Sequence, residues 1–523
     1  MREKGFALAT TLVLGVAILV MGIAGMFVSE MGFRSISSEQ AWHRAEKAAN
    51  AGLQTVSGRI IQRNFNCGDV ANFNFNGANV EVRTLSDNNR GHCFLWARAT
   101  IGNNTNVVKV AILSMGNPAG DFGTLTFRQA SNLNIGGSGA ITSCDVNCRT
   151  PAVVIGNQLS NLPQRNLVTT CPNNPKGVTA LVDPLVVSPE LLNRDLTSTV
   201  FDNINNRTEL LNMLSNQFRV SFNNGTPTGI TGTITQISDQ NGQLLSQVIN
   251  TVNPPNYDVC RAGYNNCTAS GNNINCSGNT NLRFVWDGSK YLVQPQNNIT
   301  IGGVNITAGR TVATCSAVDL GQNATLDINN FNGGGPIAAN QINLNGNVSN
   351  VTLIARNQLE DKSNNITVQN VNVFAQNIRL DDNGLKWKGG LLYSGGAGVG
   401  NFNIDLRGNS YLGSQTDPVL LITDNNMNIQ RNGTASINGL VFATDANNNL
   451  NIGDGNGNFS LNGAIVSNSN SNNNVNISGN FEINFNRSVL ENLRNKFGFL
   501  KPPPCSTSAS VRMPFIQTKM TVY

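Results

Sequence analysis

The chain has 523 residues, of which only 12% are charged, and its formal net charge is +5. Phosphate binding needs clustered lysine and arginine. No such cluster occurs, so we expect no nucleic-acid partner. Apolar residues make up 40% of the chain, which is enough for a buried core. About 85 asparagines and 52 glycines predict many tight turns, because both residues tolerate left-handed backbone.

The first predicted element is a long helix that begins in a membrane. Residues 1–5, MREKG, form a short basic leader, and an apolar run follows from Phe6 to Val28. That run is long enough to cross a hydrocarbon core of about 30 Å, with Arg2 and Lys4 on the inner side. Helical periodicity then continues without the small-residue cleavage site of a secretory signal. We therefore predict one helix over residues 6–60, apolar in its first half and amphipathic in its second.

The leader and the helix resemble a prepilin. The phrase KGFALATTLVLGVAILVMG, with AEKAANAGL at the end of the helix, resembles the PilX-type minor pilins and the tip pseudopilins of type II secretion. The resemblance covers about the first 60 residues and continues more weakly to about residue 120. It implies cleavage by prepilin peptidase between Gly5 and Phe6, and N-methylation of Phe6. It also implies a single-pass protein of the bacterial inner membrane that contacts an assembly platform and other pilin subunits, then enters a filament at the cell surface.

Thr10 departs from the pattern of that family. Most pilins carry glutamate at the fifth mature position, which is Thr10 when Phe6 is the first residue. The family's glutamate is thought to pair with the N-terminal amine of the preceding subunit, since a carboxylate in lipid is costly unless it is paired. A subunit without this glutamate needs no neighbour above it. Thr10 therefore favours a tip or initiating position in filament assembly.

Residues 61–120 predict a small antiparallel sheet. ANVEVRTL, CFLWARATIG and VVKVAILS are short alternating or apolar runs separated by turn residues. A long helix packed on such a sheet is the pilin layout, and a disulfide between Cys67 and Cys93 can join the two.

The rest of the chain predicts a large Asn-rich β domain, the head. Residues 121–184 hold short strand fragments and begin it. Residues 185–255 predict a helical insertion, which starts at Ser188-Pro189-Glu190. Residues 256–295 are rich in cysteine and contain a hairpin.

Residues 296–486 repeat a short pattern in which Ile, Leu, Val or Phe alternates with Asn, as in NITIGGVNITAG, NQINLNGNVSNVTLIARN and NVNISGNFEINFN. Such short strands bury a face only by stacking coil on coil, and asparagines spaced at turns can form ladders between adjacent coils. We therefore predict an α+β protein whose head is a parallel β-helix; an antiparallel sandwich is the alternative. Residues 487–523 predict a capping helix and a tail that shield the last coil.

The ten cysteines favour disulfides formed outside the cytoplasm. Their connectivity is open. A metal site is the alternative for Cys144 with Cys148, or for the trio at 260, 267 and 276, although CxxC pairs and histidine partners are missing. The disulfide candidates are Cys67, Cys93, Cys144, Cys148, Cys260, Cys267, Cys276 and Cys315.

Candidate catalytic and ligand-binding residues are few. A polysaccharide lyase or hydrolase needs grouped carboxylates, and the candidates, each also typical of a solvated turn, are Glu360, Asp361, Asp381, Asp382 and Asp405. Trp96, Trp286 and Trp387 can stack a sugar, although core packing fits them better.

One segment resembles the opening of a calcium loop, with oxygen ligands at Asp454, Asn456 and Asn458. Phe459 stands where the EF-hand pattern needs glycine, and a polar turn between coils fits the segment better. We expect no catalytic residue and no cofactor.

Together these patterns predict a non-catalytic minor pilin-like subunit at the tip of a type IV pilus-like filament. It would prime assembly or mediate adhesion to a surface or glycan. The alternatives are a membrane-anchored β-helical adhesin or scaffold without a filament, and a β-helical carbohydrate-active enzyme. Type IV pili and type II secretion both fit the pattern.

Overall fold

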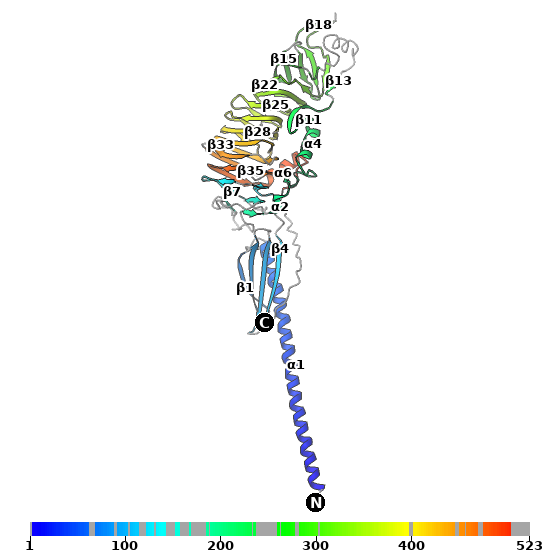
Figure 1. The fold of residues 1–523 in the computed structure, drawn as a ribbon, viewed down its shortest axis with the longest axis vertical. Helices are drawn as coiled ribbons and strands as arrows, with labels where there is room; N and C mark the ends of the chain where they lie inside the picture. The colour runs from blue at the N-terminus through cyan, green and yellow to red at the C-terminus, as the bar shows by residue number, and fades with distance from the viewer. Residues whose placement is uncertain are drawn as a thin grey trace. The chain divides into compact units, whose positions relative to one another are not determined.

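The structure is a computed structural model in which the chain forms two compact units (Figure 1). The first unit contains the described residues up to Ser114 and the second those from Phe122 to Pro503. The predicted fold class is confirmed: a long helix and a small antiparallel sheet precede a large parallel β domain with a helical insertion. The structure describes residues 3–61, 68–87, 92–102, 105–114, 122–129, 132–142, 152–156, 167–168, 185–187, 189–232, 234–236, 259–261, 263–277, 282–301, 304–396, 401–444, 449–454, 457–468 and 474–503.

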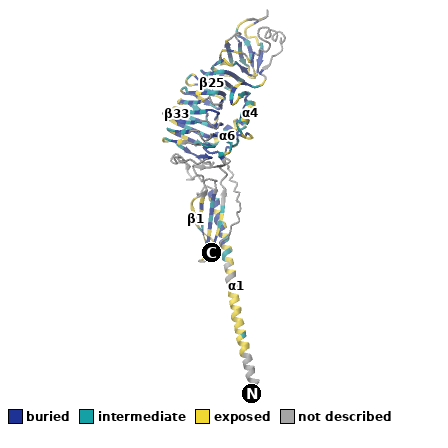
Figure 2. Ribbon diagram, in the orientation of Figure 1, coloured by how far each residue is buried: buried dark blue, intermediate teal, exposed yellow. Residues whose placement is uncertain are grey.

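α1 (Glu3–Ile61) is one helix of 59 residues. Its stretch Leu12–Phe33 is apolar and long enough to cross a membrane, with a mean hydropathy of 2.5. None of this stretch is buried within the chain (Figure 2). The second half packs on the antiparallel sheet, where the side chains with no exposed surface are Ala45, Ala48, Ala49, Val56 and Ile60.

The sheet of the first unit is antiparallel and runs in chain order. Three of its strands were predicted, and β1 is an additional one. Asn76 and Gly77, which join β1 to β2, have φ values of 50° and 79°. Such a pair forms the two-residue hairpin turn that favours Asn-Gly. The strands are β1 (Val70–Phe75), β2 (Ala78–Asp87), β3 (His92–Ile101) and β4 (Thr105–Ser114).

Gly52 lets α1 approach the sheet closely. A Cβ atom at Gly52 would lie 2.7 Å from Val80 Cγ1 and 3.1 Å from Val82 Cγ2. Lys109 of β4 reaches Glu46 of α1, with 2.8 Å between Nζ and Oε1. This hydrogen bond holds the pKa of Glu46 below its ordinary value.

The second unit is a parallel β-helix (Figure 1). Each strand of a coil pairs with the strand one coil away, which gives three stacks of parallel strands, named face 1, face 2 and face 3. Side chains alternate between inside and outside. The inward ones are mostly Ile, Leu, Val and Phe, and they form one buried core.

The three faces divide the strands as follows. Face 1 contains β14 (Asn266–Gly271), the first part of β22 (Thr325–Asn332), the last parts of β23 (Pro336–Leu344), β25 (Thr352–Asp361) and β27 (Asn372–Leu380), then β30 (Asn401–Gly408), the first part of β33 (Asn426–Ala443), β34 (Leu450–Asp454), β36 (Asn474–Ile477) and β6 (Asn132–Ile135). Face 2 contains the end of β22, β24 (Val348–Ser349), β26 (Thr367–Gln369), β28 (Lys386–Lys388), β31 (Tyr411–Leu412), the middle of β33, the first part of β35 (Gly457–Ser467), β37 (Asn480–Phe485), β7 (Ala140–Thr142) and β9 (Leu167–Val168). Face 3 contains β21 (Val318–Asp319), the first parts of β23, β25 and β27, β29 (Gly390–Ser394), β32 (Val419–Thr423), the ends of β33 and β35, β5 (Leu125–Phe127), β8 (Val153–Ile155) and β10 (Leu185–Val187).

The stack is continuous in space but not in sequence. β35, β36 and β37 near the end of the head pair in parallel with β5, β6 and β7 at its beginning. The Thr142 hydroxyl donates to Asn484 Oδ1 across this junction, although 342 residues separate the two. The early strands are therefore further coils of the same β-helix.

The expectation that the C-terminal helix shields the last coil is wrong. α6 (Arg487–Lys496) instead packs against β33 and β35, and Leu500 forms an antiparallel bridge with Phe201. The coil of β36 and β37 needs no shield, because β6 and β7 already satisfy its backbone groups. Residues 504–523 of the predicted tail lie outside the described residues.

The predicted helical insertion is present. Residues 189–232, named the strap, lie against face 3, where β12 contacts β23, β25 and β27. The longest strap helix begins at an Asn206 cap, whose Oδ1 accepts the Glu209 N–H at 3.0 Å. The strap contains α2 (Pro189–Leu192), α3 (Thr197–Val200), α4 (Arg207–Phe218), β11 (Val220–Asn223) and β12 (Thr226–Ile230).

The cysteine-rich region forms antiparallel strands at the other end of the stack. β16 and β17 are the predicted hairpin. The segment NITIGGVNITAG was expected to form a coil, but β18 and β19 make a separate two-stranded antiparallel sheet, in which local pairing satisfies the backbone. The strands are β13 (Thr235–Gln236), β15 (Asn273–Ser277), β16 (Leu282–Trp286), β17 (Tyr291–Pro295), β18 (Ile299–Ile301), β19 (Val304–Ile306) and β20 (Ala313–Cys315).

Asparagine occupies left-handed turns, as its abundance predicted. Among the described non-glycine residues with positive φ, all except Arg219 are asparagine. Asn350 and Asn370, with φ values of 54° and 53°, follow paired strands of face 2 on successive coils. A short amide side chain tolerates this backbone better than most others do.

Substitution of Gly52 tests the contact between helix and sheet. Gly52→Leu should force α1 away from Val80, because overpacking a fitted contact costs about 1–3 kcal/mol. Amide hydrogen exchange in β2 should then become about tenfold faster or more. Gly58→Leu is the matched control, since nothing lies within 4 Å of a Cβ atom there. Equal exchange in both variants would contradict the packing.

Candidate functional site

The apolar half of α1 is one candidate site. Large apolar side chains are exposed along the whole stretch Leu12–Phe33. At its two ends, Leu12 is 69% exposed and Phe33 is 71% exposed. A helix that is apolar all round is stable only in lipid or among other helices. Gly5, Phe6 and Thr10 also lie in α1, but their side chains are outside the described part of the chain. Cleavage at Gly5 and the assembly role of Thr10 therefore stay predictions.

The candidate catalytic carboxylates come together on face 1. Asp361 accepts the backbone N–H groups of Asp381 at 2.8 Å and Asp382 at 3.2 Å. Glu360 stands beside Arg379 in the register of β25 and β27. The sequence grouped these residues only in pairs, whereas the coils stack them into one column.

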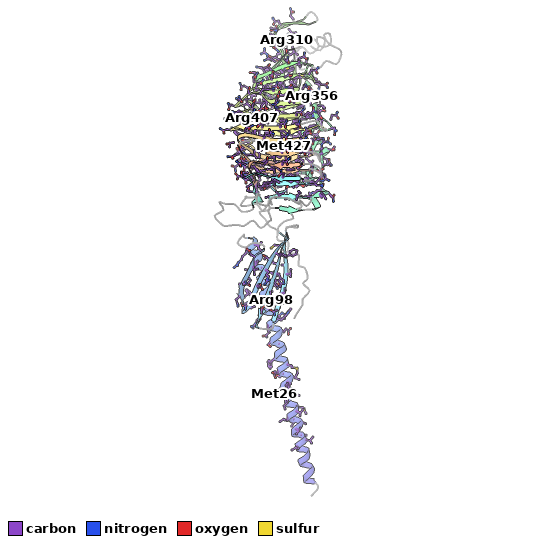
Figure 3. The ribbon with its side chains drawn as sticks, turned by 60° about the vertical axis from the view of Figure 1, so that its left-hand side comes forward. Met26, Arg98, Arg310, Arg356, Arg407 and Met427 are labelled. Carbon is purple, nitrogen blue, oxygen red and sulfur yellow. A yellow bond between two sulfur atoms is a disulfide. The ribbon has the colours of Figure 1, made fainter. Side chains whose placement is uncertain are left out.

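Nearby basic residues pair with most of this column. The separations are 2.5 Å for Lys362–Glu360, 2.6 Å for Arg379–Asp381 and 2.7 Å for Arg407–Asp405. Figure 3 labels Arg407 on β30, which pairs with the strand of Met427. These groups are held as ion pairs within single coils.

Asp361 is the most perturbed member of the column. Its side chain is almost fully buried, and burial raises its pKa to about 7. Burial also raises the pKa of Asp382, with the Asp381 charge adding to the effect. Because Asp361 is enclosed and bonded to the backbone, its perturbed carboxyl group is not presented to a ligand.

The calcium candidate lies largely outside the described residues. Asn458 is exposed at the start of β35. Asn456 and the side chain of Asp454 are not among the described residues, so calcium binding stays a prediction. Within the described chain, no group of three His, Cys, Asp or Glu residues is arranged to hold a metal ion.

The three candidate tryptophans each contact other residues of the chain, and Trp96 and Trp286 are partly exposed. Trp387 is fully buried and donates its Nε1–H to the Gly389 carbonyl at 3.1 Å, as core packing predicts. Trp286 packs on Tyr291, with a ring separation of 4.9 Å. Trp96 lies beneath the Arg83 guanidinium, 5.5 Å from the ring centre.

Two disulfides of the head are assigned. Cys267–Cys276 joins β14 to β15, and Cys260–Cys315 closes a longer loop. Cys260, Cys267 and Cys276 therefore all form disulfides, and the alternative that these three bind a metal ion is wrong. Cys93 is also disulfide-bonded. The remaining candidates, Cys67, Cys144 and Cys148, lie outside the described residues.

A buried ion pair that the sequence did not predict fastens the strap. Arg207 Nη2 of α4 lies 2.7 Å from Asp424 Oδ2, which is almost fully buried beside β32. The Tyr393 hydroxyl lies 2.7 Å from the same oxygen, and burial raises the pKa of Tyr393, so it remains a donor. Arg207 and Asp424 are 217 residues apart, so no local spacing indicated the pair.

A second arginine, Arg356, fastens the strap hairpin and is itself held by an ion pair within the β-helix. Arg356 Nη2 contacts both carboxylate oxygens of Asp319 at 2.6 and 2.7 Å. Arg356 Nε also donates to the Thr228 carbonyl of β12 at 2.8 Å. The strap is thus held by charge-assisted bonds at two places along face 3.

A second candidate site is an asparagine ladder on face 1. Asn428 Nδ2 donates to Asn403 Oδ1 at 2.9 Å, Asn451 to Asn428 at 2.7 Å, and Asn476 to Asn451 at 2.9 Å. Asn134 lies next to Asn476 in the register of β6 and β36. This ladder lies on strands. The ladder expected at turns is found on face 2, where Asn370 donates to Asn350 and Asn350 donates to Asn332.

The ladder belongs to a repeated Asn-x-Asn-Ile motif that the sequence analysis overlooked. In the motifs at 401–404, 426–429 and 449–452, the two asparagines point outward and the two apolar residues inward, as the alternation of a strand requires. This repetition was the signal that could have located the surface. The motifs are NFNI at 401–404, NMNI at 426–429, NLNI at 449–452, NVNI at 474–477 and NLNI at 132–135.

No protein-family model and no curated protein matches the chain. Among solved structures, it is similar to the competence-associated pilin ComZ from Thermus thermophilus. The identity is 9% and the TM-score 0.27, over 85% of this chain and 92% of that chain. An identity and a TM-score this low establish neither a shared family nor a shared function.

Protonation of Asp361 should couple head stability to pH. Its folded pKa of about 7 exceeds the ordinary value of 3.8, so between these values the folded head binds a proton that the unfolded chain does not. Stability therefore falls as pH rises towards 7. From pH 5 to pH 8 the wild type should lose about 2–3 kcal/mol more than Asp361→Asn, measured by urea unfolding. Parallel pH profiles for the two proteins would refute this.

Breaking the Arg207–Asp424 pair should loosen the strap. Arg207→Met leaves the buried carboxylate of Asp424 without its cation, which costs about 3–5 kcal/mol. Arg407→Met is the matched control, because its pair with Asp405 is more exposed than the pair of Arg207 with Asp424 and should cost less, about 1 kcal/mol. Urea unfolding measures both. If both variants lose a similar amount of unfolding free energy, the burial of the Arg207–Asp424 pair does not strengthen it, which contradicts the prediction.

Proposed function

We propose that the chain is a non-catalytic minor pilin-like subunit that works at the tip of a type IV pilus-like filament. One observation carries the proposal: a single helix has an apolar, exposed first half and a second half packed on a small antiparallel sheet. The first half suits the membrane before assembly and a helix bundle afterwards. The packing of the second half on a folded unit supports a retained helix over a cleaved signal.

The tip position rests on two features. Thr10 stands where a repeating pilin subunit would carry its glutamate, so no carboxylate is available for the N-terminal amine of a preceding subunit. The head is also far larger than the pilin-like unit, since it extends from about residue 122 to residue 503. Heads of this size would crowd one another if every subunit of a thin shaft carried one.

The proposed partners and location follow from this role. Prepilin peptidase would cleave after Gly5, and the inner-membrane assembly platform would receive the mature helix. Neighbouring pilin subunits would then bind the exposed apolar side chains of α1. The head would project from the filament at the cell surface, where it primes assembly or contacts a surface.

Gly5→Ala tests the proposal in the bacterium that makes the protein. The variant should remain unprocessed in the inner membrane and be missing from filaments sheared off the cells. Gly15→Ala is the matched control, because it changes a glycine of the same helix with open space around it, and it should be processed normally. Immunoblots of membranes and filaments read the outcome. Normal maturation and filament entry of Gly5→Ala would overturn the proposal.

A further inference from the structure

The ladder leaves hydrogen-bonding groups available on face 1. A primary amide has two N–H donors and two acceptor lone pairs. Asn428 and Asn451 each donate one N–H to one neighbour and accept one from the other. Each therefore keeps one N–H and one lone pair after the ladder has formed. Both side chains are partly exposed, so a bound molecule can reach these groups.

The uniformity of this surface is not required by the β-helix. The ladder row of face 1 reads Asn403, Asn428, Asn451 and Asn476 on successive coils. One outward row of face 2, on the same stack, reads Lys386, Tyr411, Ser436, Ser460 and Glu482, whereas the row beside it reads Asn438, Asn462 and Asn484. Because mixed side chains support the stack in the first of these rows, coil stacking alone does not require an all-amide row.

The outer row of the motifs adds a second line of amides. Asn401, Asn426 and Asn449 align in the register of β30, β33 and β34. The two rows are about 6.5–7 Å apart, and the coils repeat about every 4.8 Å. From β30 to β6 the ladder row covers about 20 Å along the stack. The asparagine face is defined as Asn401, Asn403, Asn426, Asn428, Asn449, Asn451, Asn476 and Asn134.

We propose that the asparagine face binds a neutral linear polysaccharide laid along the coils. The proposal rests on the adhesive part of the proposed function and names its surface and ligand. Neither row carries a charged side chain from β30 onwards. The nearby charges of Asp405 and Arg407 on β30 neutralise each other as an ion pair, so no net charge at the face selects a charged polymer. An apolar ligand would strip water from the amides without replacing their hydrogen bonds. Sugar hydroxyl and acetamido groups both donate and accept, so they match the amides.

The linear form of the ligand follows from the repeat. Each coil from β30 to β6 presents a ladder amide, and the coils of β30, β33 and β34 present an outer amide as well, so a chain molecule along the stack can make similar contacts at successive coils. Contacts after the first are intramolecular, and several weak ones add up to useful affinity. A single sugar would bind weakly.

The test uses the full-length protein in detergent with two insoluble probes, chitin and cellulose. The wild type should sediment with at least one of them, equally at low and high salt. Asn401→Arg adds a bulky charge to the asparagine face without removing a ladder amide, and should weaken binding about tenfold or more. Asn458→Arg is the matched control, because it makes the same change at an exposed asparagine of face 2, and should bind as the wild type does.

Melting curves will show whether Asn401→Arg is folded. If it is not, Asn134→Arg provides a second variant at the other end of the asparagine face. Three results would each overturn the proposal: no sedimentation with either probe, equal binding of face 1 and face 2 variants, or binding that disappears at high salt. Salt-sensitive capture of DNA would point to a charged polymer instead. Filament entry is measured separately, so failure here leaves the pilin-like role standing.

Discussion

The parallel stacking of coils is the constraint on which the head depends. A parallel strand cannot pair with its sequence neighbour through a tight turn, so its backbone groups are satisfied only by the coils before and after it. The coil of β36 and β37 meets this need by pairing with β6 and β7 from the beginning of the head. The two ends of the head sequence thus lie side by side. Neither segment has a complete set of partners until the other is in place.

Local sequence patterns predicted the elements well where neighbours in the chain decide the structure. Apolar residues alternating with asparagine identified a stack of short strands, and the run after Gly5 identified the long helix. What they could not predict are contacts between distant segments. β6 and β36 look alike in sequence, but nothing local shows that they are adjacent. The same holds for Arg207 and Asp424, and for NITIGGVNITAG, whose alternation suits a coil and a hairpin equally.

The candidate sites depend on the same stacking. It brings the carboxylates of three coils into one column, where Asp361 becomes buried and hard to ionise. It also aligns the Asn-x-Asn-Ile motifs, so that amides scattered through the sequence become two regular rows. Asparagine, which occupies left-handed turns in this chain, thereby also forms hydrogen bonds between coils on the outer surface of face 1. Two arginines that are paired with carboxylates, Arg207 and Arg356, join the strap to face 3.

The pilin-like unit gives the head its proposed place on the cell surface, and everything proposed for it starts at the junction of Gly5 and Phe6. The most direct measurement is the mass of the mature N-terminal peptide of the protein isolated from cells. The account predicts that the chain begins at Phe6, with a methylated amine. A chain that still begins at Met1, or one cleaved beyond the apolar stretch Leu12–Phe33, would contradict it.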